Sequence, residues 1–219
     1  METEVIVGDV TGISWCDRTW NWVVGCTKVS AACRDCYMYR DMRRFGRDPT
    51  VVQRAATGTF TAPVHRDRAG AWKWPDGDLV FTCSWSDFFH ADADPHRADA
   101  WDLIRRRPGL RFLVLTKRPE RIAGCLPPNW GDGWENVAFG VTAENQEAAD
   151  GRVPTLLRVP ARWRFVSAEP LLGPVHVPSG INWVIAGGES GPAAELHEFP
   201  EDLRVREFPA AWGRGSDHV

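Results

Sequence analysis

The chain after residue 78 alternates short apolar runs with stretches of helical character. Each run ends in small polar or charged residues. Continuous apolar strands that alternate with helices indicate a parallel sheet covered by helices. The sequence predicts five such strands, at residues 78–83, 110–115, 136–141, 162–166 and 181–186. A sixth, at residues 10–15, leads toward a cysteine-rich loop. Such an α/β fold is either an open, doubly wound sheet or a full or partial barrel.

Helix signals separate the predicted strands. Asp94 is the expected N-cap and Pro95 the first helical position of one helix, whose apolar face recurs every three residues. A short helix is expected from Pro119 onward. A longer one is expected at residues 146–158, broken at Pro154 because proline lacks the backbone N–H that a helix interior needs. No full helix is expected between the last two strands.

Polar clusters follow the predicted strands. Because the carboxyl ends of parallel strands form the functional edge in both candidate architectures, we expect these clusters to lie together. The alternative is that they are ordinary connecting loops, which are polar in most proteins. The candidate site residues at the strand ends are Ser84, Ser86, Asp87, Lys117, Arg118, Glu144, Asn145, Glu169 and Glu189.

Three cysteines have the spacing of a metal site. Cys26, Cys33 and Cys36 form a C-x6-C-x2-C pattern in a loop expected to follow the first strand. Three thiolates can hold a [4Fe-4S] cluster and leave one iron open to a small molecule. The alternatives are a structural zinc site that recruits Cys16 or a histidine as fourth ligand, and unligated thiols. Location at the functional edge favours the cluster. The remaining two cysteines, Cys83 and Cys125, are interpreted as small buried apolar side chains.

Composition limits the class of protein. A chain of 219 residues with net charge -3 predicts a single domain and does not favour a protein that coats nucleic acid. No apolar run has the length of a membrane span and no signal-peptide pattern follows Met1, so we expect a cytoplasmic protein with no membrane partner and with reduced cysteines. Residues 37–47 are expected to be helical, residues 38–77 to form an excursion or lid, and residues 195–219 to be a weakly ordered tail.

Six segments together resemble one phage-encoded and bacterial three-cysteine family of undefined function. They are ISWCDRTWNWVVGCTKVS at residues 13–30, CRDCY at 33–37, SWSDFFH at 84–90, VLTKRPER at 114–121, FVSAEPLLGPV at 165–175 and WVIAGGESGP at 183–192. That family in turn resembles a distant branch of the radical S-adenosylmethionine enzymes. The resemblance implies a partial (β/α)6 TIM-like barrel with the cysteine loop after the first strand.

The same resemblance implies a [4Fe-4S] cluster on the three cysteines, S-adenosylmethionine on its open iron, and an electron donor. Ser84, Ser86 and Asp87 would face the methionine end of the cofactor, and Lys117 and Arg118 its carboxylate. The ribose hydroxyls would be bound by Glu144 and Asn145, or by Glu169. Glu189 would contact cofactor or substrate. The implied activity is a radical modification of an unidentified substrate, with nucleic acid or a nucleotide suggested by the phage relatives.

A second hypothesis gives the chain no catalytic role. Zinc or a cluster would stabilise a binding protein, and tryptophan-rich loops beside arginines would stack on bases or on a protein partner. Otherwise the tryptophans simply fill the core. The tryptophans of this surface would be Trp15, Trp20, Trp22, Trp72 and Trp74.

Overall fold

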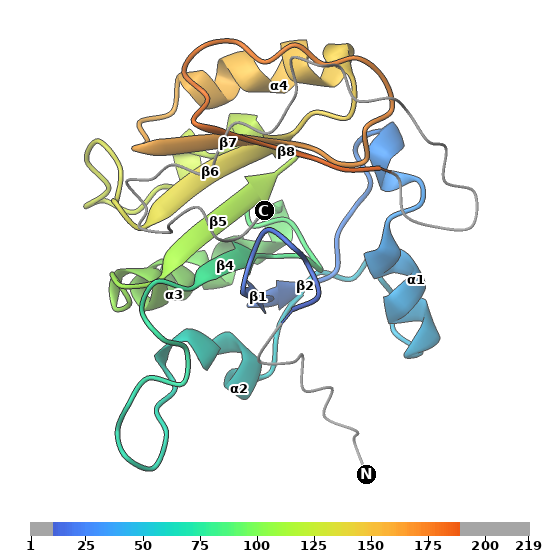
Figure 1. Ribbon diagram of the computed structural model, residues 1–219. Helices are drawn as coiled ribbons and strands as arrows, with labels where there is room; N and C mark the ends of the chain where they lie inside the picture. The colour runs from blue at the N-terminus through green and yellow to red at the C-terminus, as the bar shows by residue number, and fades with distance from the viewer. Residues whose placement is uncertain (1–10, 189–219) are drawn as a thin grey trace.

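The computed structural model describes residues 11–188, and its central element is a parallel sheet of six strands (Figure 1). All neighbouring strands in it are parallel. This confirms the predicted α/β fold. In spatial order the strands are β1 (Arg18–Trp20), β4 (Leu79–Thr82), β5 (Arg111–Thr116), β6 (Val137–Thr142), β7 (Trp163–Ala168) and β8 (Trp183–Ala186).

The other elements connect these strands or flank the sheet. A two-stranded antiparallel ribbon pairs β2 (Val23–Val24) with β3 (Gln53–Arg54). The α-helices are α1 (Tyr37–Arg44), α2 (Thr57–Phe60), α3 (Asp94–Arg105) and α4 (Gln146–Leu157). Single turns of 3-10 helix lie at Ala31–Cys33, Ala62–Val64, Ala91–Ala93, Pro119–Arg121 and Ala123–Cys125.

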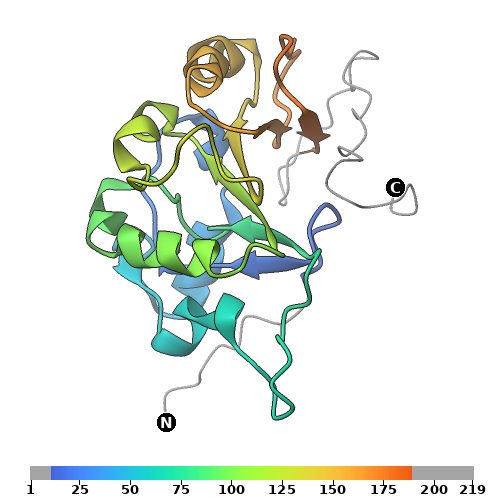
Figure 2. The same cartoon turned by 90° about the vertical axis from the view of Figure 1, so that its left-hand side faces the viewer.

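The strand order distinguishes the two architectures. A doubly wound sheet reverses its order at one point, whereas here each strand is added beside the previous one in the same direction. Right-handed connections then bring successive helices to the same face. Figure 2 shows α3 and α4 on one side of the sheet. Within residues 11–188 the edge strands β1 and β8 do not pair, so this is the open, sequential order of a partial barrel.

Side chains that alternate along each strand build two apolar layers. In β5, Phe112 and Val114 pack in the layer that also contains the buried faces of α3 and α4. Leu113 and Leu115 belong to the layer on the opposite face. That second layer is closed by residues of the segment before β1, with the Trp15 ring centroid 4.7 Å from that of Phe81. Both faces of the central strands are therefore buried, as their continuous apolar character requires.

The predicted first strand is wrong. The described part of residues 10–15 forms a bend and a turn, closed by a hydrogen bond from Cys16 N to Ile13 O. Ile13 and Trp15 do not join the sheet. They pack in the apolar layer on the face opposite α3 and α4. The first strand is instead β1, which within residues 11–188 pairs with β4 alone, and as an edge strand it tolerates polar residues. The cysteine loop still follows the first strand, as expected.

The five later strands are confirmed, with starts and ends that differ from the prediction by at most two residues, but the helices need corrections. Asp94 is the first helical residue of α3 and Ala93 its N-cap, because a 3-10 turn precedes the helix. Pro154 lies inside α4 without breaking it; the helix buries Ala149, Val153 and Leu156 against the sheet, which compensates for one missing hydrogen bond. The segment from Pro119 contains two 3-10 turns and no α-helix. No helix lies between β7 and β8, as predicted.

The segment at residues 38–77 packs mainly outside the sheet. Helix α1 ends at Arg44, three residues before the end of the predicted helix, and Phe45 is exposed. Phe60 of α2 and Trp74 join the apolar layer on the helix-covered face. The predicted tail at 195–219 lies outside the described residues. No helix in the described chain is both long and apolar enough to cross a membrane.

Candidate functional site

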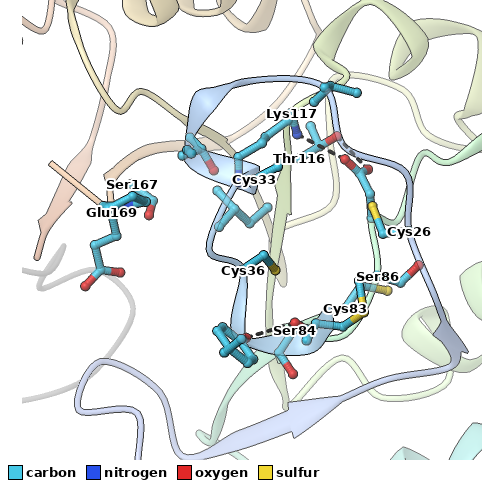
Figure 3. A pocket seen from close by; sticks show the side chains of 18 of the residues that line it. Cys26, Cys33, Cys36, Cys83, Ser84, Ser86, Thr116, Lys117, Ser167 and Glu169 are labelled. Atoms are coloured by element: carbon cyan, nitrogen blue, oxygen red, sulfur yellow. Dashed lines mark hydrogen bonds between the residues drawn. The ribbon is translucent and has the colours of Figure 1, made fainter. Parts of the chain in front are cut away.

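A cavity of about 430 Å³ opens at the carboxyl edge of the sheet. It is lined by residues from the turns after β4, β5, β7 and β8, by the end of β6, and by the cysteine loop. The edge predicted to be functional is therefore hollow, and Figure 3 shows the side chains that surround the space.

The three cysteines of the predicted metal site line this one cavity. Gly25 begins the loop with φ +89°, and a Cβ atom there would lie 2.1 Å from Val51 O, so only glycine fits. Cys33 ends a 3-10 turn, and Cys36 is the N-cap residue of α1. The loop thus bends sharply at its start and ends in a helix, which brings residues 26, 33 and 36 around the same space.

The three cysteines border one space, but they are not grouped as the ligands of a single metal ion. Zinc binds thiolates at about 2.3 Å in a tetrahedron, so all ligands of a single ion lie close together. Within residues 11–188, no group of three or more His, Cys, Asp and Glu side chains is arranged to hold a metal ion. Cys16, a suggested fourth ligand, is buried in the apolar layer on the face of the sheet opposite α3 and α4, and it does not line the cavity.

The turn after β4 supports both ends of the cysteine loop. Ser86 Oγ donates a hydrogen bond to Gly25 O at 2.6 Å, and Gly25 N donates to Trp85 O at 3.0 Å. Tyr37 Oη, at the far end of the loop, donates to Ser84 O at 2.8 Å. The buried Asn21 accepts a hydrogen bond from Trp85 N at 2.7 Å. The two predicted serines therefore line the cavity, but Ser86 directs its hydroxyl to the loop backbone.

Asp87 and Arg118 form a buried ion pair beside the loop. Asp87 is 4% exposed and Arg118 8%, and Arg118 Nη1 lies 2.9 Å from Asp87 Oδ2. Asp87 also accepts hydrogen bonds from Thr116 Oγ1 and from the backbone N–H groups of Phe89 and Lys117. Its carboxylate is thus held entirely by protein groups, as a buried charge requires.

Arg118 reaches the cysteine loop with its remaining N–H groups. Nη2 donates to Thr27 O at 2.8 Å and to Thr27 Oγ1 at 2.9 Å, and Nη1 lies 3.7 Å from Cys26 Sγ. Thr27 Oγ1 is also 2.9 Å from His90 Nε2. Since His90 Nδ1 accepts from Asp92 N, the proton lies on Nε2. These contacts join the strand ends to the residues around the first cysteine.

The surroundings shift the acidity of two thiols in opposite directions. Burial and the charge of Asp87 raise the pKa of Cys26 to about 11, against the opposing effect of Arg118. Burial would also raise the pKa of Cys33, but hydrogen bonds to the backbone of Val29 and the charge of Lys117 hold that pKa below its ordinary value. Cys33 is therefore the more readily deprotonated of the two.

The other end of the cavity has polar groups with few partners. Thr142 is 1% exposed, lines the cavity, and its hydroxyl has no hydrogen-bond partner within the described residues. The carboxylate of Glu169 accepts one hydrogen bond, from Trp15 Nε1 at 3.2 Å, and burial raises its pKa. Gly187 lies against it, where a Cβ atom would be 2.2 Å from Glu169 Oε1. Ser167 and Glu169 stand apart from the cysteines in Figure 3.

Comparison with known proteins assigns a family. Residues 10–206 match a family described as protein of unknown function (DUF5131). The chain belongs to this family. The expected membership in a family of undefined function is thereby confirmed, while the match itself carries no link to phages or to S-adenosylmethionine. No curated protein and no solved structure matches the chain.

Two of the predicted site residues in this family member do not line the cavity. Glu144 forms an ion pair with Arg152 at 2.6 Å; burial alone would raise its pKa, but its hydrogen bonds and this pair hold the pKa below its ordinary value. Asn145 caps α4, accepting a hydrogen bond from Ala148 N at 2.9 Å. Glu189 lies outside the described residues. The cavity is lined by Ser84, Ser86, Asp87, Lys117, Arg118 and Glu169.

Among the cavity residues that were not selected as site residues from the sequence, three lie at the ends of strands or directly after them: Cys83, Thr142 and Ser167. Cys83 is buried, as predicted, but it lines the cavity and has φ 70°, unusual for a non-glycine residue. Thr142 and Ser167 close β6 and β7, where the apolar runs were taken to end one residue earlier. A signal existed, because each is the last or next-to-last residue of a strand at the edge where polar clusters were expected.

Three of the five tryptophans expected on a recognition surface are buried. Trp20, Trp22 and Trp74 are buried in the apolar layer beneath the helices and cannot stack on an external base. Trp72 contacts Arg66 and Arg107, whose guanidinium carbons lie 3.4 and 4.3 Å from its ring centroid. Most of these tryptophans therefore fill the interior.

Proposed function

We propose that the chain is an iron–sulfur enzyme of the radical S-adenosylmethionine type. The observation that carries this proposal is that Cys26, Cys33 and Cys36 line one cavity at the carboxyl edge of a sequentially ordered parallel sheet. Three thiols at a functional edge leave a coordination position for a guest, whereas a structural metal needs no neighbouring cavity. A radical modification of a substrate held in that cavity is the activity that follows.

The donor set at this cavity suits a [4Fe-4S] cluster. Thiolates are the usual ligands of such a cluster, and three of them leave one iron open to a guest. Cys26, Cys33 and Cys36 border a shared space, and Cys16, considered as a fourth ligand of zinc, does not line it. The residues present thus fit a [4Fe-4S] cluster held by three cysteines.

The cavity also offers groups for a charged cofactor. When bound, S-adenosylmethionine and a reduced cluster supply a 5′-deoxyadenosyl radical that abstracts hydrogen from a substrate. The Lys117 ammonium lines the cavity and has no ion pair or hydrogen bond in the described chain, so it is available for a carboxylate. Thr142, Ser167 and Glu169 offer hydroxyl and carboxylate groups for hydroxyls or an amine. An external electron donor completes the set of partners.

The decisive experiment is anaerobic purification of the full chain followed by reconstitution with iron and sulfide. We expect a brown protein with about four irons per chain, the content of a [4Fe-4S] cluster. A Cys33→Ala variant should lose most of this iron, while Cys125→Ala, which changes a cysteine outside the cavity, should retain it. A colourless protein that takes up zinc instead would overturn the cluster proposal and support a zinc-stabilised binding protein.

The radical chemistry needs its own test. The loaded chain, reduced with dithionite and given S-adenosylmethionine, should produce 5′-deoxyadenosine detectable by chromatography and mass spectrometry. The Cys33→Ala variant is the negative control. A fully loaded cluster that yields no 5′-deoxyadenosine would leave an iron–sulfur protein and reject the enzymatic part of the proposal.

A further inference from the structure

A buried ion pair stands between two strand ends and the cysteine loop. Asp87 lies in the turn after β4 and Arg118 in the turn after β5. Both are almost fully buried, and Asp87 accepts four hydrogen bonds, from Thr116, Phe89, Lys117 and Arg118, which occupy the acceptor sites of its carboxylate. The pair is therefore a rigid support, and the Asp87 carboxylate sets the orientation of the guanidinium.

The guanidinium extends from this support to the first cysteine of the site. It holds the backbone and hydroxyl of Thr27, the residue after Cys26, with two hydrogen bonds. It also places Nη1 3.7 Å from Cys26 Sγ, within hydrogen-bond range for sulfur. A single side chain thus helps to hold the loop at the cysteine and places a positive charge beside its sulfur.

A positive charge and a hydrogen bond at a ligand sulfur have a known physical effect. They stabilise the thiolate, and they stabilise the more negative, reduced state of any cluster bound to it. Arginine suits this role better than lysine because its planar fork serves several acceptors at once. Arg118 meets a carboxylate, a carbonyl, a hydroxyl and a sulfur in this way.

We infer that Arg118 is a positioning residue that holds Cys26 and raises the reduction potential of the cluster, and that it does not bind the carboxylate of the cofactor. This inference rests on the function proposed above. It also assigns different roles to two adjacent cations: Arg118 supports the loop, while Lys117 remains available to a ligand.

Three variants of the full chain test this role. Arg118→Met removes the charge and the hydrogen bonds, and Arg118→Lys keeps the charge but loses the fork. The matched control is Arg121→Met, since Arg121 belongs to the same segment and pairs with Asp94 at 2.8 Å but does not touch the cysteine loop. The readouts are iron retained against a chelator and the reduction potential from a titration followed by electron paramagnetic resonance.

We expect Arg118→Met to have a more negative potential than the wild type and to bind its cluster roughly 10–100-fold more weakly, the usual cost of losing a partner of a metal ligand. Arg118→Lys should show a smaller negative shift, and Arg121→Met none. If Arg118→Met does not fold, Arg118→Lys decides the matter.

The inference fails if the wild type loads a cluster and every Arg118 variant that folds has the same reduction potential as Arg121→Met. A wild type that loads no cluster instead rejects the proposed function, and this inference with it. The two failures are distinguishable because the iron content of the wild type is measured first.

Discussion

The two ends of the cavity differ in how their polar groups are satisfied. At the cysteine end, the Asp87 carboxylate accepts four hydrogen bonds, all from protein groups. At the other end, the Thr142 hydroxyl has no partner in the described chain and the Glu169 carboxylate has one. Buried polar groups are normally hydrogen-bonded. The first end is thus built to hold its own loop, whereas the second has unused capacity for a molecule that enters the cavity.

Breaking the support at the cysteine end should have the largest effect on stability. Asp87→Ala leaves the Arg118 guanidinium buried without its counter-charge, which costs about 3–5 kcal/mol of unfolding free energy. Urea denaturation of the metal-free chain measures this. Asp102→Ala is the matched control, because Asp102 also pairs with two arginines, Arg105 and Arg106, but its side chain is 47% exposed and theirs are 56% and 52% exposed, and a loss of about 0–1 kcal/mol is expected there. Equal losses for the two variants would show that the cysteine end is not specially held.

At the opposite end of the cavity, a substitution should change the affinity for a ligand more than the free energy of unfolding. Thr142→Val removes a hydroxyl without a partner, so stability should stay the same or rise by up to about 1 kcal/mol. Affinity of the cluster-loaded chain for S-adenosylmethionine, measured by calorimetry, should fall roughly fivefold if that hydroxyl bonds the ligand. Thr82→Val is the control: Thr82 is buried, donates to Val80 O at 3.3 Å and does not line the cavity. A Thr142 variant that weakens folding but leaves binding intact would contradict the comparison.

A residue outside the cavity sharpens the contrast. Asn145→Ala removes the N-cap of α4 and should lower the unfolding free energy by about 1 kcal/mol. Iron content and cofactor affinity should remain at wild-type values. Reduced cofactor affinity in this variant, at unchanged iron content, would return Asn145 to the set of ligand contacts that the sequence suggested.

The smallest effect concerns the pH dependence of stability. Burial raises the pKa of Glu169 in the folded chain, with the hydrogen bond from Trp15 opposing the shift. The folded state therefore holds its proton to higher pH than the unfolded state, and stability is lost as pH rises from the ordinary carboxyl pKa through the raised one. Denaturation midpoints between pH 4 and 7 should show this decline in the wild type and less of it in Glu169→Gln. Identical pH profiles would mean that Glu169 is solvated when folded.

The sequence predicted the strands from β4 onward well, because strands buried on both faces are continuous apolar runs. It failed for β1, whose polar Arg18 and Thr19 are acceptable at the edge of the sheet, and whose apolar neighbours Ile13 and Trp15 pack on a face rather than in a strand. The predicted break of the helix at Pro154 was wrong, because the burial of one face of α4 against the sheet outweighs the low helix propensity of proline.

For the site, the sequence determined the three cysteines and the polar strand ends, since spacing and strand direction are local properties of the chain. Only the tertiary structure decided what each polar group faces. In the folded chain Arg118 lies beside Cys26, and Glu144 forms an ion pair with Arg152. Cys83 and Thr142 line the cavity. Side-chain partners that lie far apart in the chain follow from the curvature and register of the sheet, which no local pattern encodes.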